Sequence, residues 1–287
     1  MAEIWTVEKI LTWTAQHFAS KRIPDPRLSA ELLLSRVLKS SRVDLYIQFE
    51  RILTENEREQ YREFVKRRLS REPVQYILAK TEFMGFPFQI SPAVFIPRPE
   101  TELLVDSIVE TMAKFHRENS KILDIGTGSG CIAISLAKLL PRSEIYVVEK
   151  SIPAIELARQ NAELNQIDLQ FFEGDIFKIY QKLPRPFDVV VCNPPYIGLT
   201  EKESLAPEVD LYEPKEALYS GESGFEFYEG LKGFIFDLIN PSGKIFLEIG
   251  YNQAEKVRFI LAKEGFKLEF RKDYNQIERI LTIERCN

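Results

Sequence analysis

From residue 121 onward, the sequence alternates short apolar runs, rich in β-branched and aromatic residues, with longer amphipathic stretches. The apolar runs predict strands at 121–125, 144–148, 169–172, 187–191, 243–249, 267–272 and 278–283. The stretches between them predict helices at 130–139, 152–165, 223–240 and 252–264. This alternation is typical of an α/β fold, in which helices cover both faces of a parallel sheet. Because only a few residues join the last two strands, we expect the seventh strand to be antiparallel.

The first eighty residues show helical spacing of apolar residues and no alternating strand pattern. Asp25 and Pro26 resemble an N-cap followed by a proline at the first helical position. Thr54 and Glu57 match the reciprocal pattern of a capping box. We therefore expect residues 1–80 to form a small helical bundle.

An aromatic stretch rich in glycine and proline separates this bundle from the alternating region. It predicts a β-hairpin linker at 81–98. A helix is expected from about Pro99 to Arg117, at the start of a larger domain that covers 99–287. Further along, the segment 197–222 is too long for a plain connection, so we interpret it as a substrate-facing loop.

The composition restricts the classes of function. Three cysteines without CxxC spacing argue against a disulfide framework or a zinc site. The chain has only two histidines, His17 and His116, which argues against Ser-His-Asp or Cys-His catalysis. We also expect no metal site. No apolar run approaches the ~18–20 residues of a membrane span. The N-terminus carries Glu3 and Glu8 and lacks the basic region of a signal peptide, so we expect a cytoplasmic protein without membrane contact.

The formal net charge is −5, with the acidic excess in residues 91–287 and a slight basic excess in residues 1–90. A protein that grips duplex DNA usually has a strongly basic face. The one dense basic run here comprises Lys66, Arg67 and Arg68, together with Arg71. Two interpretations remain open, a solvated helix face or a docking patch for an acidic or nucleic-acid-bound partner.

A glycine loop follows the first predicted strand. Asp124 lies near the end of that strand, and the loop consists of Gly126, Thr127, Gly128, Ser129 and Gly130. Glycines let a ligand approach the backbone closely, and the helix that follows offers unpaired N–H groups. Cys131 occupies the place where a dinucleotide fingerprint needs its last glycine, and no Walker lysine follows. The spacing therefore argues against a loop that binds the phosphate groups of a nucleotide.

The second and third predicted strands are followed by acidic side chains. Glu149 follows the second strand, where a carboxylate can accept both hydroxyls of a ribose. Asp175 follows the third strand, within reach of an adenine amino group, and Ile176 can cover the ring. Ligands of open α/β sheets bind at the carboxyl ends of the strands. Any one of these features could belong to an ordinary loop. Ordinary loops do not readily explain why such residues follow several successive strands at the same position.

The fourth predicted strand ends in Asn193, Pro194, Pro195 and Tyr196. Prolines cannot continue strand pairing, so Asn193 is held at the exposed end of a buried strand. An amide or aromatic amine is a poor nucleophile, and its N–H is too weakly acidic for a side-chain base to remove first. The Asn193 side-chain oxygen and the Pro194 carbonyl can accept both N–H bonds of an –NH2 group and aim its lone pair. Tyr196 offers a face on which a planar group can stack.

Together these motifs resemble the class I, Rossmann-like, S-adenosylmethionine-dependent methyltransferases that act on a planar nitrogen. The resemblance implies a seven-stranded domain that converts S-adenosyl-L-methionine into S-adenosyl-L-homocysteine. It assigns donor binding to Asp124, Gly126, Thr127, Gly128, Ser129, Gly130, Glu149, Asp175, Ile176 and Asn193. Glu149 stands where many members of this class carry Asp, which changes the reach of the carboxylate by one methylene group.

Three further stretches, PVQYILAKTEFMGFPF, FIPRPETELLV and YEPKEALYSGESG, resemble the HemK/PrmC family of protein-(glutamine-N5) methyltransferases that modify peptide chain release factors. The resemblance covers nearly the whole chain. It implies N5-methylation of the glutamine in the Gly-Gly-Gln motif of class 1 release factors. The glutamine would then contact Asn193, Pro194, Pro195, Tyr196, Phe83 and Arg98. Among these residues, Asn193, Pro194 and Tyr196 would carry catalysis.

Two of these assignments have structural alternatives. Phe83 is equally consistent with packing in the hairpin core beside Phe86 and Phe88. Arg98 to Thr101 lie in the loop that, in the family, edges the active site, but they also match an ordinary helix start.

Two other acceptors fit the same chemistry, adenine N6 of DNA or RNA and a glutamine of a ribosomal protein. A base-modifying enzyme would need a basic target-recognition region and room for a flipped base, which a pI near 5.4 argues against. A non-catalytic binding module would not need intact donor and acceptor residues. We expect a release factor as the protein partner, no direct nucleic-acid contact and a monomeric protein.

Overall fold

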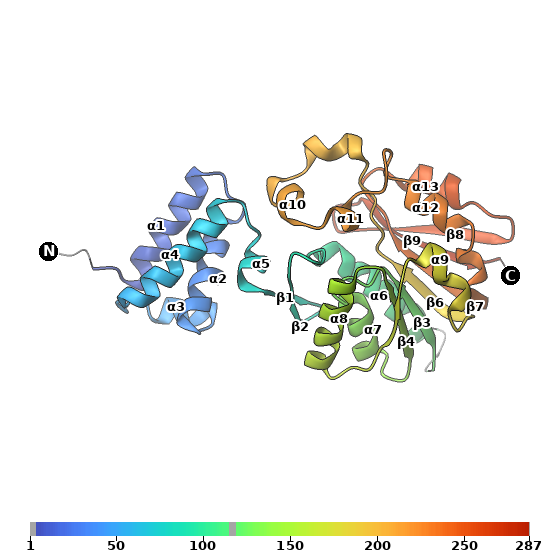
Figure 1. Cartoon of the computed structure of the whole chain (residues 1–287), viewed down its shortest axis with the longest axis horizontal. Helices are drawn as coiled ribbons and strands as arrows, with labels where there is room; N and C mark the ends of the chain where they lie inside the picture. Colours follow the sequence, from blue (N-terminus) through green and yellow to red (C-terminus); the bar gives the residue numbers. More distant parts are fainter. Residues whose placement is uncertain (1–3, 115–118, 287) are drawn as a thin grey trace. The chain divides into compact units, whose positions relative to one another are not determined.

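The computed structural model describes residues 4–114 and 119–286. The chain divides into two compact units, coloured along the sequence in Figure 1. A helical unit comprises Met1–Ala79 together with Ala206–Tyr212, and a sheet unit comprises Lys80–Leu205 together with Glu213–Asn287. The hairpin stretch is thus part of the sheet unit, and a short piece of the 197–222 segment is part of the helical unit.

The helical unit is built around one apolar core. Its helices are α1 (Val7–Ser20), α2 (Pro26–Leu38), α3 (Arg42–Ile47), α4 (Glu55–Leu69) and α5 (Val74–Leu78). Helix α4 begins with the predicted capping box, because Thr54 accepts from the Glu57 backbone and Glu57 accepts from the Thr54 backbone. Asp25 precedes α2, but its backbone is left-handed (φ 46°) and its side chain makes no capping hydrogen bond.

Helix α10 (Pro207–Tyr212) packs within the helical unit through the predicted basic run. Glu208 Oε1 lies 3.2 Å from Arg68 Nη1 and 3.3 Å from Arg71 Nη1, and the Arg68 side chain is only 5% exposed. Arg67 pairs with Glu72 at 2.8 Å. These three arginines therefore do not form a merely solvated face, because each has an acidic partner inside the unit.

The sheet unit begins with a two-stranded hairpin, β1 (Lys80–Phe83) and β2 (Phe86–Gln89). The strands pair antiparallel, with Phe83 opposite Phe86. Met84 and Gly85 form the connection, and both have positive φ, as a two-residue type I′ turn requires.

The main sheet confirms the predicted α/β class. Its strands are β3 (Lys121–Ile125), β4 (Glu144–Glu149), β5 (Gln170–Glu173), β6 (Phe187–Cys192), β7 (Ile239–Glu248), β8 (Phe266–Lys272) and β9 (Glu278–Arg285). They lie in the order β5-β4-β3-β6-β7-β9-β8. Strands β3 to β7 pair in parallel, whereas β9 pairs antiparallel with both β7 and β8. The antiparallel seventh strand predicted from the short final connection is confirmed.

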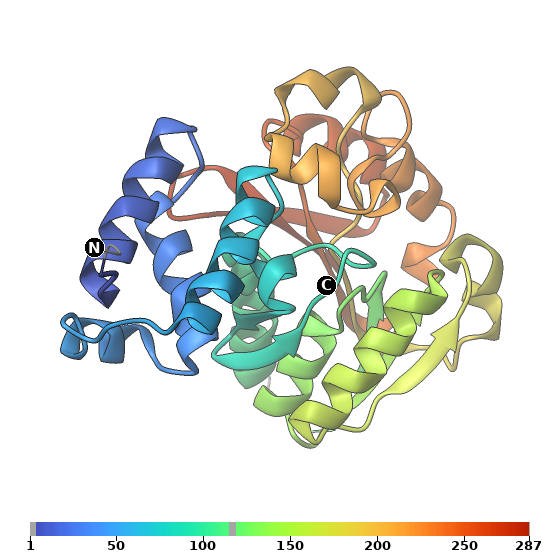
Figure 2. The same ribbon diagram turned by 60° about the vertical axis from the view of Figure 1, so that its left-hand side comes forward.

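Helices pack on both faces of this sheet (Figures 1 and 2). The longer ones are α6 (Pro99–Lys114), α7 (Cys131–Leu139), α8 (Ile152–Asn165), α12 (Glu226–Lys232) and α13 (Ala254–Leu261), and the short ones are α9 (Ile176–Ile179) and α11 (Lys215–Leu218). Single turns of 3₁₀-helix occur at Tyr180–Lys182 and Ile235–Asp237, and a longer one at Leu199–Ser204.

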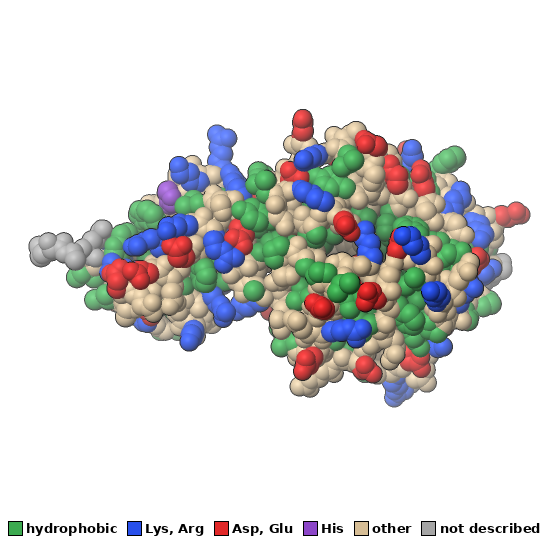
Figure 3. Space-filling model, viewed as in Figure 1, with side chains coloured by type: hydrophobic (Ala, Val, Ile, Leu, Met, Phe, Trp, Pro, Cys, Tyr) green, Lys and Arg blue, Asp and Glu red, His purple; other side chains and the backbone are tan. Residues whose placement is uncertain are grey.

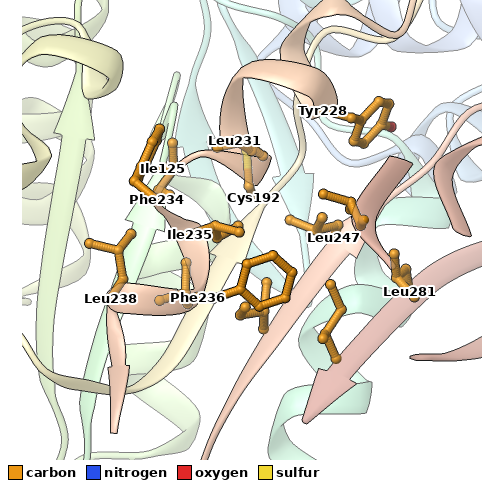
Figure 4. Packing of buried hydrophobic residues seen from close by; sticks show 14 of the residues in the cluster. Ile125, Cys192, Tyr228, Leu231, Phe234, Ile235, Phe236, Leu238, Leu247 and Leu281 are labelled. Atoms are coloured by element: carbon orange, nitrogen blue, oxygen red, sulfur yellow. The ribbon is translucent and has the colours of Figure 1, made fainter. Parts of the chain in front are cut away.

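Alternate residues of β6 enter different apolar cores, as the pleat of a strand requires. Val189 and Val191 pack against α6, α7 and α8. Val190 and Cys192 face the other side, against α12, α13 and the turn at Ile235–Asp237. Figure 4 shows this second core, in which Cys192 lies among side chains from both the sheet and the helices. A strand buried on both faces explains why the sequence before Asn193 is continuously apolar.

Two predicted helices differ from those observed. The helix predicted at 223–240 is only Glu226–Lys232, because the chain then turns at Gly233 and buries Phe234, Ile235, Phe236 and Leu238 in the core before β7. The helix predicted at 252–264 is shorter, Ala254–Leu261. The predicted end at Arg117 lies outside the described residues, as does His116.

Candidate active site

The register of the parallel strands brings four loop starts to one level of the sheet edge. Ile125 of β3 pairs with Val148 of β4 and with Cys192 of β6, and Cys192 pairs with Leu247 of β7. The residues that follow are Gly126, Glu149, Asn193 and Glu248. The sheet therefore brings the glycine loop, one predicted carboxylate and the Asn-Pro-Pro-Tyr turn together, and it adds Glu248, which sequence reasoning missed.

The glycine loop bends sharply into the start of α7. Gly126, Gly128 and Gly130 all have left-handed φ values, of 72°, 56° and 81°. Only Gly130 is also crowded, because an added Cβ would lie 3.0 Å from Ile134 Cδ1. The positions of a Cβ at Gly126 and Gly128 meet no heavy atom closer than 4.0 Å, so open space adjoins the backbone at the front of the loop.

Asp124 contacts this loop from the interior of the protein. Its side chain is fully buried, and Thr127 Oγ1 donates to its Oδ2 at 2.6 Å. Burial raises the pKa of Asp124 to about 7, and the neighbouring charge of Glu149 adds to the rise, although the Thr127 hydrogen bond opposes it. Asp124 thus fixes the loop conformation from the protein interior.

The Glu149 carboxylate lies directly against the glycine loop. Its Oε2 accepts from the Gly128 N–H at 3.0 Å, and its Oε1 accepts from the N–H groups of Lys150 and Ser151 at 2.8 and 2.9 Å. A carboxylate has about four lone-pair positions, and these three N–H groups use three of them, so about one position is left for a further donor such as a ribose hydroxyl.

Asp175 and Ile176 form the next part of the edge. Asp175 caps α9, because its Oδ1 accepts from the Phe177 N–H at 3.1 Å, and it lies 3.8 Å from Lys178 Nζ. Ile176 is 5% exposed and belongs to the core cluster. Capping occupies one oxygen of Asp175, so its predicted contact with an adenine amino group would use the other.

The Asn193 turn is held by two side chains from outside the turn. Asn193 Nδ2 donates to Thr101 Oγ1 at 3.2 Å, and Gln253 Nε2 donates to the Tyr196 carbonyl at 2.7 Å. Pro194 is buried, whereas Asn193, Pro195 and Tyr196 are half-buried. Burial raises the pKa of the Tyr196 hydroxyl, so the ring stays neutral at physiological pH.

Glu248 is 2% exposed at the end of β7. Burial raises the pKa of Glu248 to about 7, against hydrogen bonds from the Thr101 and Asn193 side chains and the charge of Arg279, which lower it. The sequence signal that could have found it is the acid that ends an apolar strand in IFLEIG, next to the strand that ends in Asn193.

Arg98 and Phe83 have partners inside the sheet unit. Arg98 forms an ion pair with Glu213, a residue only 3% exposed, and its guanidinium lies 4.7 Å from the centre of the Phe95 ring. Glu213 also accepts from the Ile96 N–H at 3.2 Å. Phe83 is 1% exposed and meets Phe88 edge to face, 6.3 Å between ring centres. Both side chains have clear structural contacts, and their contact with substrate stays a prediction.

Across 4–114 and 119–286, no group of three or more His, Cys, Asp or Glu side chains is arranged to hold a metal ion. None of the helices in those ranges is both long enough and apolar enough to span a bilayer.

Comparison with known proteins gives matches over both parts of the chain. The family model of the PrmC N-terminal domain matches residues 9–78, and that of the methyltransferase small domain matches residues 98–214. Among solved structures, a methyltransferase from Pyrococcus furiosus superposes with a TM-score of 0.51 at 21% identity, covering 70% of this chain and 89% of that one, which supports the fold.

Two curated relatives are similar over nearly their whole length. The release factor glutamine methyltransferase of Geobacter sulfurreducens is 41% identical over 97% of this chain and 96% of its own. The enzyme of the same name from Chlorobaculum tepidum is 38% identical over 98% of this chain and 97% of its own. The chain therefore belongs to the family of release factor glutamine methyltransferases.

Proposed function

We propose that this protein transfers the methyl group of S-adenosyl-L-methionine to the side-chain nitrogen of a glutamine, in the Gly-Gly-Gln motif of class 1 release factors. The observation that carries the proposal is the common level of the glycine loop, Glu149 and the Asn193 turn at one sheet edge. Family membership supports the same acceptor. The protein is proposed to act as a monomer in the cytoplasm.

The residues at the edge fit the donor. Open space beside Gly126 and Gly128 leaves room for a ligand against the backbone, and Glu149 keeps about one acceptor position for a ribose hydroxyl. Asp175 and Ile176 would meet the adenine, by a hydrogen bond and by apolar contact. When bound, the sulfonium group of the donor supplies an electrophilic methyl group.

The acceptor amide has to be positioned, because its nitrogen is a weak nucleophile. The Asn193 side-chain oxygen and the Pro194 carbonyl would accept its two N–H bonds and turn its lone pair toward the methyl group. The same two oxygens would stabilise the positive charge that grows on nitrogen as the new bond forms. Tyr196 would hold the planar amide by its ring. The methylated nitrogen then loses its extra proton, for which no strong base is needed.

Labelled methyl transfer tests this proposal. Purified release factor, the same factor with the Gly-Gly-Gln glutamine changed to alanine, an adenine-rich DNA and ribosomal protein are offered as acceptors, with Asn193→Ala as the enzyme control. We expect label only on the intact release factor and only with the unaltered enzyme. Label on DNA or ribosomal protein would keep the chemistry and overturn the acceptor. On the face drawn in Figure 3, basic and acidic side chains are interspersed, which does not favour DNA.

A further inference from the structure

Glu248 ends β7 beside the Asn193 turn, and the mechanism described above does not use it. The register pairs Cys192 with Leu247, so the next residues, Asn193 and Glu248, leave neighbouring strands at the same level. Glu248 is 2% exposed, and its Oε2 has no hydrogen-bond partner among the described residues. Burying a carboxyl group is energetically unfavourable. A buried carboxyl group next to the Asn193 turn therefore indicates a role in function.

The direction of each hydrogen bond around Glu248 follows from what the groups can donate. Asn193 Nδ2 donates to Thr101 Oγ1 at 3.2 Å, and the side chains of both residues also interact with the Glu248 carboxyl. An ionised carboxylate only accepts, and the Thr101 hydroxyl has a proton of its own to donate. The nitrogen of the Asn193 carboxamide is therefore the end that faces Thr101 and Glu248, and its oxygen is turned the other way.

The residues that hold Asn193 are themselves fixed. Thr101 lies in the first turn of α6, is 2% exposed, and its N–H donates to the Arg98 carbonyl at 3.1 Å. The backbone carbonyl of Glu248 accepts from the buried Tyr228 hydroxyl at 3.0 Å. The backbones of Thr101 and Glu248 are therefore held in place on the same side of Asn193, which favours one orientation of its carboxamide.

We propose that Glu248 and Thr101 are positioning residues that hold the Asn193 carboxamide with its oxygen toward the –NH2 group of the substrate. This inference rests on the proposed function. In the reversed orientation, the Asn193 –NH2 group would meet the substrate –NH2 group, and two donors form no hydrogen bond. A carboxylate on the nitrogen side also polarises the carboxamide and makes its oxygen a better acceptor as charge develops on the substrate.

The first test is Glu248→Gln, which keeps the shape and replaces an acceptor-only group by one that also donates. We expect kcat to fall about 10- to 100-fold, somewhat less than for loss of a transition-state donor outright. The KM for the release factor should change less than about twofold, and so should the Kd of S-adenosylmethionine measured by calorimetry. The reason is that the contacts made with substrate and donor in the ground state remain. Glu284→Gln is the matched control, since Glu284 pairs with Lys244 at the other end of the β7–β9 pairing from Glu248, and its kcat should be unchanged.

The second test uses Thr101, in case the glutamine variant does not fold. Thr101→Ser keeps the hydroxyl and should retain kcat, whereas Thr101→Val keeps the shape and should lose it. Because both residues act through Asn193, combining Thr101→Val with Glu248→Gln should reduce kcat no further than the more severe single variant. Equal kcat for Thr101→Ser and Thr101→Val, or losses that multiply in the double variant, would overturn the inference.

The result also separates this inference from the proposed function. An unaltered enzyme that does not label the release factor would refute the function itself. An unaltered enzyme that labels it, beside a Glu248→Gln variant with the same kcat, would refute only the positioning role.

Discussion

Replacing Glu248 by glutamine should stabilise the protein at about pH 8 while leaving its stability near pH 5 almost unchanged. The physical reason is the cost of an ionised carboxyl group inside the sheet unit. Burial raises the pKa of Glu248 to about 7, Thr101 and Arg279 oppose the rise, and the charge of Glu100 adds to it. The same substitution is expected to lower kcat, so its effects on stability and on activity have opposite signs.

The magnitude follows from the two pKa values of Glu248. The carboxyl group titrates near 4.5 in the unfolded chain and at about 7 in the folded protein. At about 1.4 kcal/mol for each pKa unit, the ionised folded form costs about 3 kcal/mol. Because the folded state holds the proton more tightly, stability falls as the pH rises from about 4.5 to about 7. Glutamine avoids this cost but offers one acceptor oxygen fewer, a loss of about 1 kcal/mol, which leaves a gain of about 2 kcal/mol.

Thermal unfolding of the full chain at about pH 5, 6, 7 and 8 measures this difference. A gain of about 2 kcal/mol raises the Tm of a unit of this size by about 4–8 °C. The Tm difference between Glu248→Gln and the unaltered protein should appear between about pH 5 and pH 8. Glu284→Gln, on the same strand pair, should show no such pH-dependent gain. A Tm difference that is constant over this range would refute the reasoning, because it could not come from titration of Glu248.

Three further predictions concern other parts of the chain. Gly130→Ala should lower the free energy of unfolding by about 1–3 kcal/mol and weaken donor binding measured by calorimetry, because φ is 81° and the added Cβ meets Ile134; unchanged donor affinity would contradict this. Glu208→Gln should destabilise the helical unit by about 3 kcal/mol, because it leaves the buried Arg68 without its anion, and urea unfolding would show it; an unchanged midpoint would contradict it. Thr54→Ala should cost about 1 kcal/mol in the same assay through loss of the α4 cap, whereas Thr54→Ser should cost little.

The sheet could be predicted well because its signals are local. Each apolar run is bounded by turn residues, and the short connection before the last strand excludes a parallel crossover. The helix predicted at 223–240 was wrong beyond Lys232, because apolar residues such as Ile235 and Leu238 have helical spacing but are buried in an irregular segment. Periodicity cannot distinguish a long helix from a short one followed by a buried turn.

Some parts of the candidate site could likewise be predicted from local sequence signals, whereas other features of the structure depend on contacts between residues far apart in the sequence. The glycine loop, Glu149 and the Asn193 turn carry their own motifs, and the strand register brings them to one edge, while their contacts with donor and substrate stay predictions. The position of helix α10 could not be predicted, because it depends on ion pairs between Glu208 and arginines far away in the sequence.

Glu248 shows why the sequence alone misses such a residue. In IFLEIG it is one acid at the end of an apolar strand, with no motif around it. Its meaning depends on two facts of tertiary structure, the register that sets it beside Asn193 and the packing of α6 that adds Thr101. Substitution by glutamine would stabilise the folded chain at neutral pH, so folding alone does not account for a carboxylate here. Orientation of an amide does account for it, because the ionised carboxylate accepts hydrogen bonds and donates none, which excludes the wrong rotamer of Asn193.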